Sequence, residues 1–136
     1  MNRPILLDTC ALIWLMEEKL GGDALDELKD METDPEGVVI SPISAWEIGQ
    51  LVSKGRLRLA TDPNSCLALI VKRGMALAPL PIDVLIASSF LPGRDLRDPA
   101  DRIVAATARA FGYRIMTRDR PLLDFAAEGH VQAIAC

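Results

Sequence analysis

The chain has 136 residues, of which half are hydrophobic and a quarter are charged, and its formal net charge is −4. This length is typical of one domain, and the composition excludes a disordered, collagen-like or low-complexity protein. We therefore expect a single domain over residues 1–136. The apolar run 5–16 is too short to span a bilayer and is interrupted by Asp8, so neither a membrane segment nor a signal peptide is predicted.

The charge is distributed unevenly along the chain. Residues 1–36 hold ten acidic against three basic side chains, whereas residues 37–136 hold nine acidic against twelve basic ones, a net charge of +3. Seven arginines and no lysine lie between Arg94 and Arg120, and a guanidinium group fits a phosphate well. The overall acidity therefore does not exclude a nucleic-acid partner. The arginine-rich stretch is either a solvated face with ion pairs or a phosphate-binding patch.

Strands and helices are predicted to alternate along the chain. Short apolar runs predict strands at 4–8, 37–41, 78–80, 113–117 and 130–135. Helical periodicity and capping residues, with Thr9 as the first cap, predict helices at 11–16, 23–32, 42–53, 63–73, 82–90, 99–112 and 121–127. This alternation implies βαβ units and a mainly parallel sheet with helices on both faces, which is the α/β fold class.

Two aspartates are predicted at the edge of the sheet where the strands end. Ligands of open parallel sheets bind beyond the carboxyl ends of the strands, because loops and helix N-termini gather there. Asp8 ends the first strand, and Asp119 lies two residues beyond Thr117, where a later strand ends. Each aspartate can also be an ordinary turn or cap residue.

Glu47 lies at the centre of a helix face formed by Ile43, Trp46 and Leu51. A carboxylate in apolar surroundings costs several kcal/mol unless it is paired or neutralised. The nearest basic residue, Lys54, is seven positions away, so the partner has to be a distant side chain or a bound cation. This favours a functional role for Glu47 over a structural one.

Asp101 shares a helix stripe with Val104, Ala105 and Ala108. With Asp98 as the N-cap and a proline after it, capping alone can explain both aspartates. Capping does not explain the apolar stripe that continues from Asp101, because that stripe draws the side chain towards the core.

Four acids can thus converge at one end of the sheet: Asp8, Glu47, Asp101 and Asp119. Two carboxylates about 4 Å apart repel by about 4 kcal/mol at an effective dielectric constant of about 20, so such a group needs a divalent cation. Because all the candidate ligands are oxygen atoms, Mg²⁺ or Mn²⁺ is predicted rather than Zn²⁺.

Other chemistries have few candidate residues. The single histidine, His130, has no catalytic serine or cysteine pattern around it, and the chain contains no Gly-rich phosphate loop. Trp14 and Trp46 lie in apolar stretches and are expected in the core. Three cysteines match no zinc spacing and are expected to be reduced thiols of a cytoplasmic protein: Cys10, Cys66 and Cys136.

The order of these motifs resembles the PIN-domain family, and within it the VapC-type ribonuclease toxins of bacterial toxin-antitoxin modules. The resemblance runs almost end to end and rests on the segments 5–9, 41–48, 54–57, 97–107 and 117–119. These segments read Ile-Leu-Leu-Asp-Thr, Ser-Pro-Ile-Ser-Ala-Trp-Glu-Ile, Lys-Gly-Arg-Leu, Arg-Asp-Pro-Ala-Asp-Arg-Ile-Val-Ala-Ala-Thr and Thr-Arg-Asp. In this order and spacing the combination is specific.

The resemblance implies a three-layer α/β/α fold and a metal-dependent endoribonuclease. It matches the catalytic, metal-holding acids of the family to Asp8, Glu47, Asp101 and Asp119. Asp98 is an alternative or accessory fourth acid, and Thr9 and Thr117 match small polar positions beside the site.

The resemblance also implies partners and a reaction. Family members are usually homodimers held by a cognate antitoxin, and they act on structured RNA, often transfer RNA or ribosomal RNA. With Mg²⁺ or Mn²⁺ in the site, hydrolysis by an activated water is expected to leave 5′-phosphate and 3′-hydroxyl ends. The side chains expected to hold the flanking phosphates are Lys54, Arg56, Arg97, Arg102, Arg118 and Arg120.

Two other functions remain open on the sequence. A magnesium-dependent phosphatase would use Asp8 as a nucleophile, but Thr9 and Cys10 follow it where a second, acid-base aspartate would be needed. A non-catalytic RNA- or protein-binding module would use the acids as helix caps and the arginines as contacts.

Overall fold

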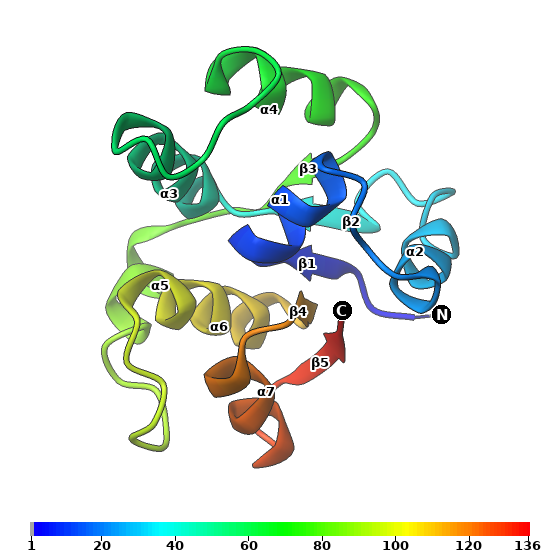
Figure 1. The fold of residues 1–136 in the computed structure, drawn as a ribbon. Coiled ribbons are helices and arrows are strands. Elements are labelled where there is room, and N and C mark those ends of the chain that lie inside the picture. The colour runs from blue at the N-terminus through cyan, green and yellow to red at the C-terminus, as the bar shows by residue number, and fades with distance from the viewer. Residues whose placement is uncertain (1) are drawn as a thin grey trace.

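The computed structural model describes residues 2–136 and contains a parallel sheet at its centre (Figure 1). In the described residues the strand order is β3-β2-β1-β4-β5, and every neighbouring pair is parallel. The strands are β1 (Ile5–Leu7), β2 (Val38–Ile40), β3 (Ala76–Leu77), β4 (Arg114–Thr117) and β5 (Gln132–Ala135). Because all of them run in one direction, their carboxyl ends share one edge of the sheet, called the carboxyl edge below.

Helices connect the strands and cover both faces of the sheet. They are α1 (Thr9–Met16), α2 (Gly22–Lys29), α3 (Pro42–Ser53), α4 (Pro63–Lys72), α5 (Ile82–Ala87), α6 (Pro99–Phe111) and α7 (Arg120–Ala127). The helices that directly follow β1, β2 and β4 all begin at the carboxyl edge. Within residues 2–136, no helix has both the length and the apolar character that crossing a bilayer requires.

Alternate side chains of the strands face two separate cores. Ile5 and Leu7 of β1 pack with buried residues of α1, α2, α3 and α4. Leu6, which points the other way, packs with α6 and α7. All three β1 side chains are fully buried. The sheet is therefore the middle layer, and the predicted three-layer α/β/α fold is confirmed.

Capping residues set the starts of four helices, as the sequence predicts for α3, α4 and α6. Ser41, Asp62, Asp98 and Asp119 are the N-caps of α3, α4, α6 and α7, and each accepts a hydrogen bond from a backbone N–H of the first turn. Each helix also has a proline in its first two positions. At the other end of α6, Gly112 adopts a φ of 75°, which favours glycine and ends the helix.

The third strand and the fifth helix differ from their predicted bounds. The predicted strand 78–80 is wrong, because β3 is Ala76–Leu77. Ala78 still donates a hydrogen bond of 2.8 Å to Ile40, but Pro79 has no N–H group and the ladder ends there. The helix predicted to reach residue 90 ends at Ala87.

The predicted core position of Trp46 is also wrong. Trp46 is 60% exposed, whereas Ile48, two positions later on α3, is fully buried. Two positions correspond to about 200° around a helix, so these side chains point in nearly opposite directions. Trp14 of α1 is half-buried and packs against the core that contains Ile5 and Leu7, as predicted.

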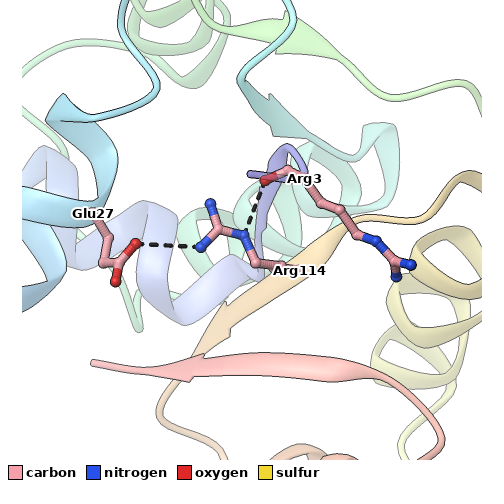
Figure 2. A network of polar contacts seen from close by, with 3 residues as sticks. All are labelled: Arg3, Glu27 and Arg114. Carbon is pink, nitrogen blue, oxygen red and sulfur yellow. Dashed lines mark hydrogen bonds and ion pairs between the residues drawn. The ribbon is translucent and has the colours of Figure 1, made fainter. Parts of the chain in front are cut away.

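Arg114 ties α2 to the edge of the sheet opposite the carboxyl edge (Figure 2). Its Nη1 lies 3.2 Å from Oε2 of Glu27, and its Nε donates a hydrogen bond of 2.9 Å to the carbonyl oxygen of Arg3. The Arg114 side chain is only 14% exposed, and its Nη2 is buried without a partner among residues 2–136. Glu27 therefore supplies the counter-charge of a largely buried cation.

Replacing Glu27 by glutamine is expected to lower the free energy of unfolding by about 1–2 kcal/mol, because Arg114 loses its charged partner while it stays buried. Chemical denaturation of the two proteins measures this difference. Asp26→Asn is the matched control, since Asp26 is an exposed acid on the same helix. Equal losses in the two variants would contradict a specific role of the Glu27 pair.

Candidate active site

Asp8 occupies the bend between β1 and α1. It is 3% exposed, and its Oδ1 accepts a hydrogen bond of 2.7 Å from the backbone N–H of Ala11. Asp8 is therefore the N-cap of α1, and the prediction that Thr9 caps this helix is wrong, because the hydroxyl of Thr9 points to other partners. The backbone N–H of Asp8 donates to Met116 at 3.1 Å, which fixes the bend beside β4.

Thr117 links Asp8 to Asp119 across two neighbouring strand ends. Its fully buried hydroxyl donates a hydrogen bond to Oδ2 of Asp8 and accepts one of 2.9 Å from the backbone N–H of Asp119. Oδ2 of Asp119 in turn accepts a hydrogen bond of 3.3 Å from Leu122 and caps α7. One threonine thus holds both aspartates in place at the carboxyl edge.

Thr9 makes a second link, from α1 to α3. Its hydroxyl bonds to Oε1 of Glu47 and lies 2.9 Å from the hydroxyl of Ser44. A threonine hydroxyl has one proton, so when Thr9 donates to Glu47, Ser44 donates to Thr9. Thr9 and Ser44 are buried and Glu47 is half-buried. The Glu47 carboxyl is therefore oriented by Thr9, whose hydroxyl is in turn held by Ser44.

Asp98 and Asp101 lie at the start of α6 and differ in their hydrogen bonding. Oδ1 of Asp98 accepts a hydrogen bond of 3.1 Å from the backbone N–H of Asp101, so Asp98 is the cap that the sequence predicts. Asp98 is exposed and Asp101 is half-buried. Capping accounts for the side chain of Asp98. It does not account for that of Asp101, whose carboxyl has no hydrogen bond to another residue in the described part of the chain.

Burial and neighbouring carboxylates raise the pKa of three acids at the carboxyl edge. Burial is the largest cause of the raised pKa of Asp8, and the charges of Asp119 and Glu47 add to it. Burial likewise raises the pKa of Glu47, with a contribution from Asp98. For Asp101, burial and the neighbouring carboxylates together raise the pKa to about 8. These neighbours are, in decreasing order of effect, Asp98, Asp119, Asp8 and Glu47. Asp101 thus lies within electrostatic reach of the other three predicted acids, and Asp8 lies within reach of Asp119 and Glu47.

The donor atoms of this site fit a hard divalent cation such as Mg²⁺ or Mn²⁺. The acids offer carboxylate oxygens, and a cation among them would offset both the burial and the repulsion that raise the pKa of Asp101. The nearby thiol of Cys10 is a poor ligand: although the residue is exposed, burial of the group and the surrounding carboxylates raise its pKa to about 11. Among residues 2–136, no three His, Cys, Asp or Glu side chains are spaced to hold a metal as they stand.

Five of the six side chains predicted to hold phosphates are exposed: Lys54, Arg56, Arg97, Arg118 and Arg120. The sixth, Arg102, is half-buried, and its Nε donates a hydrogen bond of 2.8 Å to the carbonyl oxygen of Ser88 while its Nη1 donates to that of Leu96. Arg102 therefore fastens the loop before α6, and we leave it out of the proposed phosphate contacts.

Ser44 is not among the predicted site residues, although the structure places it in the hydroxyl pair beside Glu47. Ser44 is fully buried, and this is costly for a hydroxyl group without a hydrogen-bond partner. The signal was present in the sequence, because Ser44 precedes Glu47 by three positions and residues at that spacing lie on the same side of a helix.

Comparison with known proteins identifies the family. The family model of the PIN domain matches residues 5–128. Ribonuclease VapC22 of Mycobacterium tuberculosis is 28% identical to this chain over 120 residues, which cover 87% of this chain and 88% of that protein.

Solved structures of similar fold come from toxin-antitoxin complexes. VapBC2 from Rickettsia felis, bound to a DNA fragment from its promoter, has a TM-score of 0.72 at 15% identity, covering 96% of this chain and 97% of the other. DNA-bound VapBC from Salmonella typhimurium has a TM-score of 0.67 at 17% identity, covering 98% of each chain. FitAcB from Neisseria gonorrhoeae has a TM-score of 0.59 at 22% identity, covering 96% of each chain.

The family match extends from β1 through α7 and includes all the acids at the carboxyl edge. The solved structures show the same fold over almost the whole chain. These matches confirm the resemblance that the motifs indicate: this chain belongs to the PIN domain family.

Proposed function

We propose that this protein is a Mg²⁺- or Mn²⁺-dependent endoribonuclease and the toxin of a toxin-antitoxin module. One observation carries the proposal. Four acids from four separate segments meet at the carboxyl edge of a PIN fold: Asp8, Glu47, Asp101 and Asp119. The raised pKa values of Asp8, Glu47 and Asp101 support a concentration of negative charge there, which a bound cation would offset. The name of the similar VapC22 ribonuclease supports the same activity.

The residues of the site have distinct proposed roles. The four acids would hold the cation, while Thr117 orients Asp8 and Thr9 orients Glu47. Asp98 stabilises the start of α6 and adds negative charge beside Asp101. When bound, the cation supplies Lewis-acid chemistry, lowering the pKa of a water and offsetting charge on the leaving oxygen. The expected RNA products carry 5′-phosphate and 3′-hydroxyl ends.

The substrate proposed is a structured RNA such as a transfer RNA or a ribosomal RNA. Exposed cations near the ends of α3, α6 and β4 are available for phosphates, namely Lys54, Arg56, Arg97, Arg118 and Arg120. Phosphate contacts fix the position of an RNA and carry little sequence information, so recognition of RNA shape is expected to dominate.

Two protein partners belong to the proposal, a cognate antitoxin and a second copy of this chain. The similar structures are named as VapBC and FitAcB assemblies, which supports an antitoxin partner. A homodimer is supported by an apolar surface on and after α5, where Ile82, Ile86 and Phe90 are 77%, 58% and 80% exposed. Contiguous exposed apolar side chains of this size commonly mark interaction sites.

The double substitution Ile86→Lys and Phe90→Asp is expected to convert a dimer into a monomer. Light scattering on a size-exclusion column is expected to give the parent protein twice the chain mass of 14.8 kDa and the variant a single chain mass. Circular dichroism checks that the variant stays folded. A parent protein that elutes as a monomer at micromolar concentration would contradict the proposed dimer.

The proposed activity is tested by mapping RNA 5′ ends after expression in bacterial cells. The parent protein is expected to generate a small set of new 5′-phosphate ends in structured RNA, and Glu47→Gln is expected to generate none. Glutamine preserves the size of the side chain and the acceptor for Thr9, so the comparison isolates the negative charge. Identical ends from both proteins would favour the non-catalytic binding module. Hydrolysis of small phosphate esters without RNA cleavage would favour the phosphatase.

A further inference from the structure

An arginine stacked on a tryptophan lies beside the acidic site. Cζ of Arg118 is 3.6 Å from the ring centroid of Trp14. The indole is half-buried against the core, so its ring is held in place, whereas the Arg118 side chain is exposed. A guanidinium at this distance over an indole is a favourable cation–π contact. Arg118 is therefore restrained in position without being buried.

The backbone places this stack next to the proposed catalytic acids. Arg118 stands between Thr117, which bonds to Asp8, and Asp119, which caps α7. The chain end packs against the same edge, since the backbone N–H of Cys136 donates a hydrogen bond of 3.0 Å to Thr117. Burial raises the pKa of the Cys136 thiol, the charge of Asp8 raises it further, and that of Arg118 lowers it. The charges of Asp8 and Arg118 thus both act on the Cys136 thiol, which places Arg118 and Asp8 at the same part of the carboxyl edge.

Like Arg94 and Arg97, and unlike the other four arginines between Arg94 and Arg120, Arg118 has a guanidinium group without a polar partner in the described part of the chain. The guanidinium groups of Arg102, Arg109 and Arg114 donate to backbone carbonyls, and that of Arg120 lies 4.0 Å from Asp124. Arg118 has neither a hydrogen bond nor an ion pair from its side chain within residues 2–136. Its ring contact uses the face of the guanidinium and leaves the N–H groups at the edge free.

We propose that Trp14 is a positioning residue that holds Arg118 as a preformed binding site for an RNA phosphate next to the one that is cleaved. This inference rests on the proposed ribonuclease function and deepens it. A guanidinium binds a phosphate through two parallel N–H donors, and a side chain that is already restrained loses less conformational freedom on binding. A cation here also offsets the repulsion between the acidic site and the RNA backbone.

Arg118→Gln is expected to weaken RNA binding and to lower its dependence on salt. Removing one phosphate contact reduces the slope of log K against log salt concentration by about 0.7–0.9. Because this contact is made equally in the bound RNA and in the transition state, KM is expected to rise while kcat stays unchanged. Arg3→Gln is the matched control, since it removes the same charge at the opposite edge of the sheet, where the Arg3 side chain points away from Glu27 (Figure 2).

Trp14 is tested through its dependence on Arg118. Trp14→Leu is expected to raise KM by about two- to fivefold, and Trp14→Phe, which keeps an aromatic ring, is expected to stay closer to the parent. In the Arg118→Gln background, Trp14→Leu is expected to have no further effect on KM, because the positioned group is gone. A tryptophan that acts only in the core would give the same increase in both backgrounds.

The experiment measures binding of unfractionated bacterial transfer RNA at four salt concentrations, and KM and kcat for cleavage of total bacterial RNA in Mg²⁺. Thermal unfolding shows whether each variant is folded. If Trp14→Leu does not fold, Trp14→Phe is used in its place in both backgrounds. An unchanged salt slope for Arg118→Gln, or equal effects of Trp14→Leu in the two backgrounds, would overturn the inference while the parent still cleaves RNA. A parent that neither binds nor cleaves RNA would overturn the proposed function and the inference together.

Discussion

Replacing Asp8 by asparagine is expected to lower RNA cleavage by about 10³-fold, which corresponds to a loss of about 4 kcal/mol of transition-state stabilisation. Asparagine keeps the oxygen that accepts the hydrogen bond from Ala11, so α1 keeps its cap. The variant loses one negatively charged oxygen at the carboxyl edge, and with it the acceptor of the hydrogen bond from Thr117. The measurement is the rate of RNA cleavage at saturating Mg²⁺.

The same variant is expected to be more stable than the parent protein in the absence of divalent cations. Burial and the neighbouring acids raise the pKa of Asp8, so the folded state is penalised when this carboxyl ionises. Asp26→Asn, at an exposed position of α2, is the control and is expected to change neither property. An Asp8→Asn protein with full activity would contradict the assignment of the site.

The second large effect is a fall in the free energy of unfolding with rising pH, caused by the carboxyl group of Asp101. Its pKa is about 3.8 in an unfolded chain and about 8 in the folded protein. Between these values the folded state binds a proton that the unfolded state has released, so the free energy of unfolding falls as the pH rises. The contribution of Asp101 is fully present below about pH 4 and is lost once the pH passes about 8. Chemical denaturation of the cation-free protein from pH 5.5 to 9 measures this decline.

Saturating Mg²⁺ is expected to abolish the contribution of Asp101 to this pH dependence, because the cation-bound folded state and the unfolded state then both hold Asp101 ionised. A cation binds the ionised carboxylate, so its affinity rises with pH by up to about tenfold per unit, until Asp101 is fully ionised above about pH 8. Asp101→Asn is expected to flatten both the decline in stability and the rise in affinity. A stability profile of the cation-free parent that is already flat between pH 5.5 and 9 would show that Asp101 is not perturbed.

The layers of the fold were predictable because the apolar pattern of each segment agrees with its place in the three layers. Continuous apolar runs such as Ile5–Leu7 need cover on both faces, and the helices between the strands supply it. The bounds of β3 were not predictable to the residue, because Ala76–Leu77 is a two-residue edge strand whose position depends on pairing with β2. Trp46 shows a further limit: an apolar residue on a helix is not buried when another side of that helix faces the core.

The acids of the site were predictable for a different reason. Glu47 and Asp101 contradict the apolar patterns of their helices, and such conflicts are expected at functional sites. Asp8 and Asp119 follow strand ends, which a parallel sheet places along one edge. The hydroxyl partners were harder to predict, because the bond from Thr117 to Asp8 joins residues 109 positions apart. Only the packing of β1 beside β4 brings these two side chains together.

Calorimetric titration of Mn²⁺ into the purified protein at pH 8 tests most directly whether the acids at the carboxyl edge form one cation site. The parent protein is expected to show saturable binding and, at about 100 times the dissociation constant, an increase of about 2.7 kcal/mol in the free energy of unfolding. Both effects are expected to disappear in Asp8→Asn and to persist in Asp26→Asn. Absence of binding to the parent at millimolar Mn²⁺, or equal binding to parent and Asp8→Asn, would contradict the account.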